Sequence, residues 1–319
     1  METTFTYDRY ITGRSFVGRK AEKEEFLKAF SEGMHISLYE SPKSGVNSLI
    51  HQCLLEAKLK GDVFNVVEID FTPVRKVQDF IALFNKAINK PIETRTIIIC
   101  HEFQNVLRTE DSFHLLKTFG EKASEPGRNF SFIFCGSQVN AMKQIFEKGH
   151  FCRKQTVHIH LHPISYKEAE NYITKGFLVS GKVIEKELVE KVYDILQGNI
   201  YYLNHFAAIC DGLSRGFITD PVVEESLLSL LSINQPRFLS IIYDLTGFQI
   251  SLLKAILDGQ TRLSSTDTIA AYELNSSANV KRLKEALCKK EIVVFDSTGK
   301  AKLQDPLFEY WLRKYYFIL

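Results

Sequence analysis

The sequence predicts an α/β protein with three parts: a parallel sheet with helices on both faces, a helical segment and a C-terminal winged helix-turn-helix. Three observations lead to this prediction. Apolar strand-like runs alternate with amphipathic helical patterns through the first half of the chain, which is typical of parallel βαβ units. Two of these runs, residues 96–100 and 130–135, are almost wholly apolar, as strands buried on both faces are. Beyond residue 235, short helical patterns lead to a β-hairpin pattern at 292–304.

Composition sets broad limits. The 319 residues have room for two or three domains, and 45% hydrophobic with 24% charged residues is ordinary for a soluble protein with packed cores. A formal net charge of +2 gives no global nucleic-acid signal, so any DNA-binding face must be local. The 6 cysteines are scattered without a C-x-x-C pair, which indicates reduced thiols. No signal-peptide pattern and no membrane-length apolar run is present, so we expect a cytoplasmic protein without a membrane partner.

Strand and helix patterns follow one another in order through the first part. We expect strands at 35–39, 63–70, 96–100, 130–135 and 156–161, with helices at 20–30, from 48, at 77–87 and at 113–122. Polar residues follow three of the strands, at 40–47, 101–102 and 137–138. In parallel sheets, ligands bind at the carboxyl ends of the strands. These three clusters are therefore the candidate site.

The segment 40–47 lies where a phosphate-binding loop lies, between a strand and a helix whose N-terminus and loop amides point at an anion. The signature of such a loop is G-x-x-x-x-G-K-[ST]. Aligned on Gly45, the chain has Glu40 for the first glycine, Val46 for the lysine and Asn47 for the hydroxyl residue. Val46 carries no charge for phosphate, and Asn47 is a poorer Mg²⁺ ligand than a hydroxyl. The candidate nucleotide-binding set is thus degenerate: Lys43, Ser44, Gly45, Val46, Asn47 and Ser48.

Two alternatives remain open for this loop. Lys43 could replace the missing lysine and Ser48 the missing hydroxyl, which needs two compensations together. The plainer interpretation is a strand–turn–helix corner without a ligand.

An ordered set of motifs resembles the archaeal-type ATPases, a P-loop family related to the AAA+ and STAND groups. The motifs are FVGR at 16–19, the loop, HEFQ at 101–104, GSQ at 136–138, GNIYY at 198–202 without the family's proline, and the segments 272–280 and 305–313. They cover nearly the whole chain. The resemblance implies an AAA+-like P-loop domain at 1–163, a helical lid and connector at 164–234 and a winged helix at 235–319.

The same resemblance assigns roles at the strand ends. Glu102 would activate the attacking water, Ser137 would be the sensor near the γ-phosphate, and His101 replaces the aspartate that organises Mg²⁺. The resemblance implies ATP or ADP with Mg²⁺ as the cofactor. The residues of the loop do not by themselves indicate any cofactor. Phosphoryl transfer relies on lysine and metal to neutralise the charge that develops on phosphate. Here Val46 replaces the lysine, and His101 replaces the aspartate that organises the metal. We therefore expect no hydrolysis, and Glu102 has the alternative role of a carboxylate that caps a neighbouring helix.

Three histidines alternate along the last predicted strand: His158, His160 and His162. Three same-face positions span about 13 Å at a rise of ~3.3 Å per residue. One ion bound at ~2.1 Å cannot contact all three. We predict no metal site.

The C-terminal pattern predicts a recognition helix at 276–290, capped by Ser276 or Ser277, and a wing whose turn is at 297–299. Asp305 and Pro306 begin a final helix. The recognition helix is basic, and its candidate DNA-binding residues are Lys281, Arg282 and Lys284, with Lys300 and Lys302 in the wing. The alternative is that these lysines form the solvated face of a helix that packs on the ATPase-like core or binds protein.

These features predict an ATPase-like regulatory or scaffold protein with an unidentified protein partner, in which nucleotide binding is weakened or lost and hydrolysis is absent. Two alternatives stay open. One is an ATP-binding switch or ATPase that uses Lys43, Ser48 and Glu102. The other is a DNA-binding regulator that acts through the winged helix.

Overall fold

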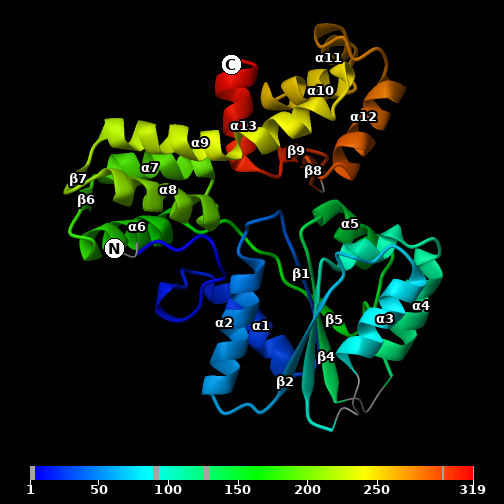
Figure 1. The fold of residues 1–319 in the computed structure, drawn as a ribbon. Coiled ribbons are helices and arrows are strands. Elements are labelled where there is room, and N and C mark those ends of the chain that lie inside the picture. The colour runs from blue at the N-terminus through cyan, green and yellow to red at the C-terminus, as the bar shows by residue number, and fades with distance from the viewer. Residues whose placement is uncertain (1–3, 89–92, 126–128, 297, 319) are drawn as a thin grey trace. The chain divides into compact units, whose positions relative to one another are not determined.

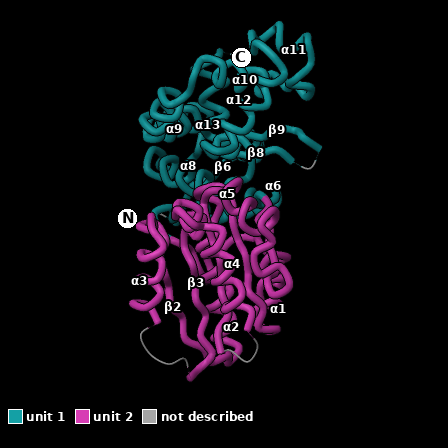
Figure 2. The backbone as a smooth tube through the Cα atoms, turned by 90° about the vertical axis from the view of Figure 1, so that its right-hand side faces the viewer, with its two compact units in different colours: residues 1–9, 163–319 teal, residues 10–162 magenta. Residues whose placement is uncertain are grey.

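The computed structural model describes residues 4–88, 93–125, 129–296 and 298–318. The chain forms two compact units, shown in different colours in Figure 2. One is Tyr10–His162, and the other combines Met1–Arg9 with Pro163–Leu319. The chain therefore passes between the units twice, after Arg9 and after His162. Among the described residues, no helix is long and apolar enough to cross a membrane.

The unit Tyr10–His162 contains the predicted parallel sheet, which the structure confirms. Its five strands pair in the order β2-β3-β4-β1-β5, and every pair is parallel. The strands are β1 (His35–Tyr39), β2 (Asn65–Asp70), β3 (Thr96–His101), β4 (Phe130–Gly136) and β5 (Thr156–His158). Because β4 lies between β1 and β3, the carboxyl ends of these three strands are neighbours. They carry the three polar clusters.

Helices cover both faces of this sheet, as Figure 1 shows. They are α1 (Lys20–Ser31), α2 (Val46–Leu59), α3 (Val77–Ala87), α4 (Ser112–Ala123) and α5 (Val139–Lys143). A π-helical turn, Gln144–Lys148, extends α5, and short 3-10 turns occupy Gly13–Ser15 and Phe103–Arg108.

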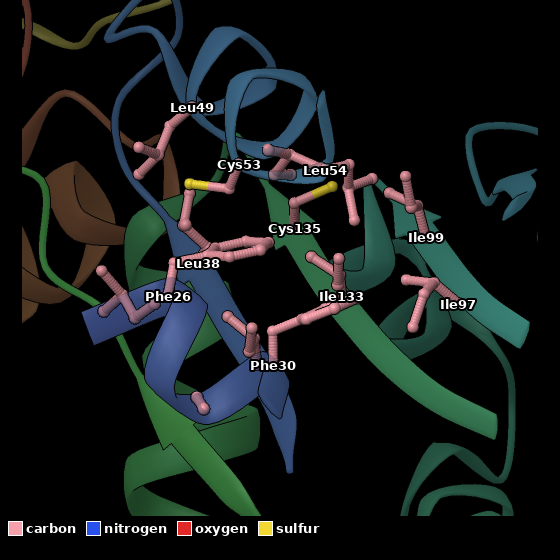
Figure 3. Packing of buried hydrophobic residues seen from close by; sticks show 14 of the residues in the cluster. Phe26, Phe30, Leu38, Leu49, Cys53, Leu54, Ile97, Ile99, Ile133 and Cys135 are labelled. Atoms are coloured by element: carbon pink, nitrogen blue, oxygen red, sulfur yellow. The ribbon is translucent and has the colours of Figure 1, made fainter. Parts of the chain in front are cut away.

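The face toward α1 and α2 is a mainly aliphatic core. Leu38, Ile99 and Ile133 from three strands pack with Leu49 of α2 and Phe26 of α1 (Figure 3). All five are at most 1% exposed. Burial of each such side chain contributes about 1.5–3 kcal/mol, so this core fixes α2, and with it the loop, against the sheet.

The opposite face is packed almost entirely with phenylalanine. Phe134 of β4 is fully buried, with ring centroids of Phe103, Phe132 and Phe151 at 4.7, 5.2 and 5.3 Å. The cluster continues into α3 and α4 through ring contacts of Phe80, Phe84 and Phe119. Most pairs are tilted or edge-to-face, the geometry that the ring quadrupole favours.

A buried guanidinium anchors the loop after β1. Arg19, which precedes α1 in a left-handed conformation (φ 61°), donates hydrogen bonds to the carbonyl oxygens of Ser44, at 2.9 Å, and His162. It also pairs with Glu22 Oε1 at 3.3 Å. The same carboxylate oxygen accepts the backbone N–H of His162 at 3.3 Å. The FVGR segment thus joins α1, the loop and the end of the unit.

The second unit begins with helices and a two-stranded parallel sheet. The elements are α6 (Tyr166–Val179), β6 (Val183–Ile184), α7 (Lys186–Leu196), α8 (Ile200–Leu213), β7 (Phe217–Ile218) and α9 (Asp220–Tyr243). The N-terminal segment packs here too, since Phe5 is fully buried against Tyr172 and Phe177.

The winged helix follows as predicted. It comprises α10 (Gly247–Leu257), α11 (Thr266–Ala271), α12 (Ser277–Lys289), β8 (Val293–Phe295), β9 (Ala301–Leu303) and α13 (Pro306–Trp311), which a π-helical turn, Leu312–Tyr316, extends. Ser276 caps α12 by accepting the N–H of Asn279, and Asp305 caps α13. Of the predicted wing turn at 297–299, residue 297 lies outside the described residues.

Two expected elements were wrong. The last strand of the sheet ends at His158 and does not continue to 161, because only Thr156–His158 pair with β1. The lid and connector were expected to end at 234 and the winged helix to begin at 235. A single helix of 24 residues, α9, spans this boundary and contains Pro236. An interior proline removes one backbone hydrogen bond of a helix, so this continuity has no local sequence signal.

We predict that Phe134→Ala destabilises the sheet unit by about 3–5 kcal/mol, because it removes a ring from the centre of a close-packed core. Hydrogen exchange of the β3 and β4 amides would measure the loss. The matched control is Phe113→Ala, whose side chain is 79% exposed, with an expected effect within ~0.5 kcal/mol. Equal effects of the two changes would contradict this account of the core.

A second prediction concerns the Arg19–Glu22 pair. Burial raises the pKa of Glu22, but hydrogen bonds from backbone amides and the charge of Arg19 outweigh burial, so the pKa is lowered overall. The pair's contribution to stability is therefore complete above the unfolded pKa and is lost as the pH falls through the folded pKa. Glu22→Gln should cost about 2 kcal/mol at pH 7 and progressively less below about pH 4.5, measured by denaturant unfolding across pH.

Glu24→Gln is the control for this pH series. Glu24 lies on the same helix, is 69% exposed at the side chain and pairs with Lys20 at 4.0 Å. Its replacement should change stability by less than ~1 kcal/mol at every pH. A loss for Glu22→Gln that stays the same at acid and neutral pH would refute the proposed role of the ionised carboxylate.

Candidate functional site

The loop between β1 and α2 has the strand–loop–helix geometry of a phosphate-binding corner. Lys43 and Gly45 adopt left-handed conformations, with φ of 70° and 96°. α2 begins at Val46, two residues earlier than the sequence suggested, and Leu49 N–H bonds to Gly45 O at 3.0 Å. The backbone therefore forms the corner even though the signature is incomplete.

The side chains at the signature positions of this loop contact the core, the loop backbone or solvent. Val46, at the lysine position, packs against the aliphatic core. Asn47 is exposed. Glu40, at the first glycine position, accepts the N–H of Ser41 on its own carboxylate at 2.9 Å. One loop amide thus already has an anionic partner from the chain. The hydroxyl oxygen of Ser44 is buried without a hydrogen-bond partner in the described part of the chain.

One face of α2 binds the segment that precedes FVGR. Ser48 Oγ accepts the N–H of Ile11 at 3.0 Å, and Gln52 Oε1 accepts that of Gly13 at 2.7 Å. Between them, the ring of His51 stacks on Tyr10 with centroids 4.0 Å apart. Adjacent helix positions are rotated by about 100°, so Ser48 faces a different direction from Asn47, where a metal-binding hydroxyl would stand.

Glu102 and Ser137 are brought together, as the motif order implied. Glu102 Oε2 accepts Ser137 Oγ–H and Gln104 Nε2–H, each at 2.6 Å. The carboxylate does not cap the 3-10 turn Phe103–Arg108 that follows it. Glu102 has φ 51°, and its carbonyl accepts the N–H of Asn105 at 3.0 Å.

Gln104 was not identified from the sequence as a site residue. Its position two residues after Glu102, in the HEFQ motif, could have indicated that it lies beside that carboxylate. Its side chain is 2% exposed and lies against Gly136, where an added Cβ would come within 2.3 Å of Gln104 Oε1. That oxygen has no hydrogen-bond partner among the described residues. The glycine of GSQ therefore makes room for the glutamine that holds Glu102.

His101 occupies the position of the metal-organising aspartate and is enclosed by the chain itself. Its Nε2 lies 2.9 Å from Glu68 Oε2, and its Nδ1 lies 3.4 Å from Cys135 Sγ. Burial, with the nearby charge of Glu102, raises the pKa of the Cys135 thiol, which stays protonated at neutral pH. Burial also lowers the pKa of His51, on the adjacent face of α2. The Glu68 contact comes from a neighbouring strand and has no local sequence signal.

Of the three histidines expected along one strand, only His158 lies in β5. His158 is the last residue of β5, and its ring stacks on Tyr39 at 4.2 Å and contacts His160 edge-on at 4.1 Å. Burial lowers the pKa of His158 to about 4, so it is neutral at pH 7. In the described part of the chain, no three His, Cys, Asp or Glu side chains are grouped to hold a metal ion.

The candidate DNA-binding residues of α12 do not share one environment. Lys281 and Arg282 are exposed on the helix surface. Lys284 Nζ lies 4.6 Å from the ring centroid of Phe295 in β8 and so packs on the hairpin. Lys290, just beyond the helix, pairs with Asp244.

Comparison with known proteins supports this architecture. Residues 236–314 match the family described as a probable winged helix domain. No curated protein matches the sequence. Among solved structures, the Walker-type ATPase PABY2304 of Pyrococcus abyssi has a TM-score of 0.73 at 14% identity, over 96% of this chain and 99% of that one.

Two proteins of Aeropyrum pernix are also similar. ORC2, solved in ADPNP and ADP complexes, has a TM-score of 0.62 at 14% identity over 95% of each chain. ORC1, solved in complex with DNA, has a TM-score of 0.52 at 11% identity, over 95% of this chain and 94% of that one. At such identities the similarity is one of fold. The chain has the fold of the Walker-type ATPases, with an AAA+-like parallel sheet and a C-terminal winged helix.

Proposed function

We propose that this protein is an ATPase-like regulatory or scaffold protein that has weakened or lost nucleotide binding, does not hydrolyse ATP and acts on a protein partner. The observation that carries the proposal is the packing of Val46 into the aliphatic core at the lysine position. A triphosphate needs cationic groups at this corner, and in working enzymes lysine and Mg²⁺ supply them.

The charges around the corner support the same conclusion. Glu40 and Glu102 place two carboxylates near the loop and at the adjoining strand end, where phosphate and its metal would bind. His101, which replaces a metal-binding carboxylate, already pairs with Glu68. By the family resemblance Glu102 stands at the position of a general base, but a base alone does not neutralise the charge that develops on phosphate. Its bonds to Ser137 and Gln104 are sufficient to explain it as a structural group that joins β3 to β4.

The test is calorimetric titration of the full chain with ATP and ADP, with and without Mg²⁺. We expect no binding at millimolar nucleotide for the natural sequence. The variant Glu40→Gly/Val46→Lys/Asn47→Thr/His101→Asp should gain Mg²⁺-dependent binding, because it restores the cation, the hydroxyl and the metal ligand together.

The competing interpretation, a switch or ATPase that uses Lys43 and Ser48, makes the opposite prediction. Micromolar binding by the natural sequence, about −8 kcal/mol, would overturn our proposal on binding. Mg²⁺-dependent turnover that Glu102→Gln abolishes would overturn it on hydrolysis.

A second candidate function is DNA binding through the winged helix, and the exposure of Lys281 and Arg282 on α12 favours it. The fold relative ORC1 of Aeropyrum pernix was solved in complex with DNA, which supports this candidate. Two cations at phosphates would release about two counterions on binding.

Fluorescence anisotropy with duplex DNA across salt concentrations would test this function. Lys281→Ala/Arg282→Ala should reduce the slope of log K against log salt by about 2. The matched control is Lys175→Ala/Arg215→Ala, which removes the same charges from exposed positions outside the winged helix. Absence of binding at low salt, or equal slopes for the two double variants, would reject the candidate.

A further inference from the structure

Three polar side chains from three helices meet where the lid helices adjoin the winged helix, within the unit that contains both. Tyr202 of α8 donates its hydroxyl hydrogen to Asp305 Oδ2 at 2.9 Å. Arg237 of α9 donates to the same carboxylate oxygen and, at 3.0 Å, to the Tyr202 oxygen. The other oxygen of Asp305 caps α13 by accepting the N–H groups of Leu307 and Phe308 at 3.0 and 3.1 Å. We name Tyr202, Arg237 and Asp305 the latch.

The latch is buried at Tyr202 and reaches the surface at Arg237, whose side chain is 43% exposed. Tyr202 is 1% exposed, and the Asp305 side chain is 21% exposed. Burial, together with the Asp305 charge, raises the pKa of Tyr202, so the hydroxyl stays a donor at physiological pH. Separating the two segments would leave the buried phenol of Tyr202 without its carboxylate partner, which is unfavourable.

Two further contacts join the same segments. Gln197, which follows α7 in a left-handed conformation, donates to Glu309 of α13 at 3.2 Å. Lys314 beyond α13 lies 3.7 Å from Glu224 in the first half of α9. Both contacts come from residues that follow the Asp305 cap, and both reach segments before the winged helix, so they support one docked orientation.

The backbone provides a rigid connection as well. α9 begins among the lid helices, where Lys191 of α7 pairs with Asp220 at 2.9 Å, and continues unbroken to Tyr243. The match to the winged helix family begins at residue 236, inside this helix. α9 therefore begins among the lid helices and ends inside the matched winged helix segment.

From these observations we propose that the lid helices and the winged helix move as one rigid body that the latch holds in a single orientation. Any displacement of the lid then carries α12, with Lys281 and Arg282, at a fixed angle. By thermodynamic linkage, a partner that restrains α12 restrains the lid equally. This inference does not depend on whether nucleotide or DNA binds.

The experiment measures the distance between the two segments directly in the full chain. Spin labels on unnatural amino acids at Lys175 in α6 and Lys289 in α12, both exposed, leave the 6 cysteines unmodified. Double electron–electron resonance should give one narrow distance distribution for the natural latch. Tyr202→Phe/Asp305→Ser should broaden it, because serine still caps α13 while the second carboxylate oxygen is lost.

Tyr243→Phe is the matched control, since this tyrosine ends α9 with 80% exposure, and it should leave the distribution unchanged. Hydrogen exchange provides the second measurement. In Tyr202→Phe alone, the α13 amides should exchange about tenfold faster, as expected for one lost charge-assisted hydrogen bond, while α12 stays protected. Asp305→Ser could unfold the winged helix, in which case the double variant could not be interpreted. The single variant Tyr202→Phe still tests the proposal, because Tyr202 lies in α8, outside the winged helix.

Two results would overturn the proposal. Several distances in the natural protein would mean that the segments already move separately. An unchanged narrow distribution in the double variant, together with unchanged α13 exchange in Tyr202→Phe, would mean that the latch does not hold them.

Discussion

The guanidinium of Arg19 connects three segments that are far apart in the sequence. Its hydrogen bonds reach the carbonyl of Ser44 in the loop and that of His162 at the end of the unit, while Glu22 neutralises its charge. A buried cation with donors in a fixed fork can satisfy several carbonyls at once, which an aliphatic residue cannot. The shape of the loop, the start of α1 and the exit of the chain toward the second unit therefore depend on one side chain.

The residues that support the fold are largely different from those at the strand ends. The cores on the two faces of the sheet, one mainly aliphatic and one of phenylalanine, contain none of the degenerate positions except Val46, and there the replacement adds apolar packing. Around the candidate site, side chains of the chain contact one another: Glu40 accepts a loop amide, Glu68 contacts the imidazole of His101, and Ser137 donates to Glu102. A fold of this kind does not by itself fix an activity, which depends on the residues at the site.

The sequence was most informative where local pattern decides structure. Strand His35–Tyr39 and helix Val77–Ala87 were predicted to the residue, because alternation and amphipathic period are unbroken there. The course of α9 was not, since Pro236 argues locally for a break and only packing within the unit overrides it. Within the site, Glu102 and Ser137 were paired by motif order. Their partner Gln104, and the Glu68–His101 contact, depend on which side chains neighbouring strands bring together.

The chain has a single tryptophan, Trp311, and its place in α13 separates the two units spectroscopically. Trp311 is 6% exposed and packs with Phe238 and Phe308 at centroid distances of 5.6 and 6.0 Å. The sheet unit Tyr10–His162 contains no indole. Tryptophan emission during unfolding therefore reports only on the unit that contains the winged helix, whereas far-ultraviolet circular dichroism reports on both. A difference between the two curves would reveal how independently the units unfold.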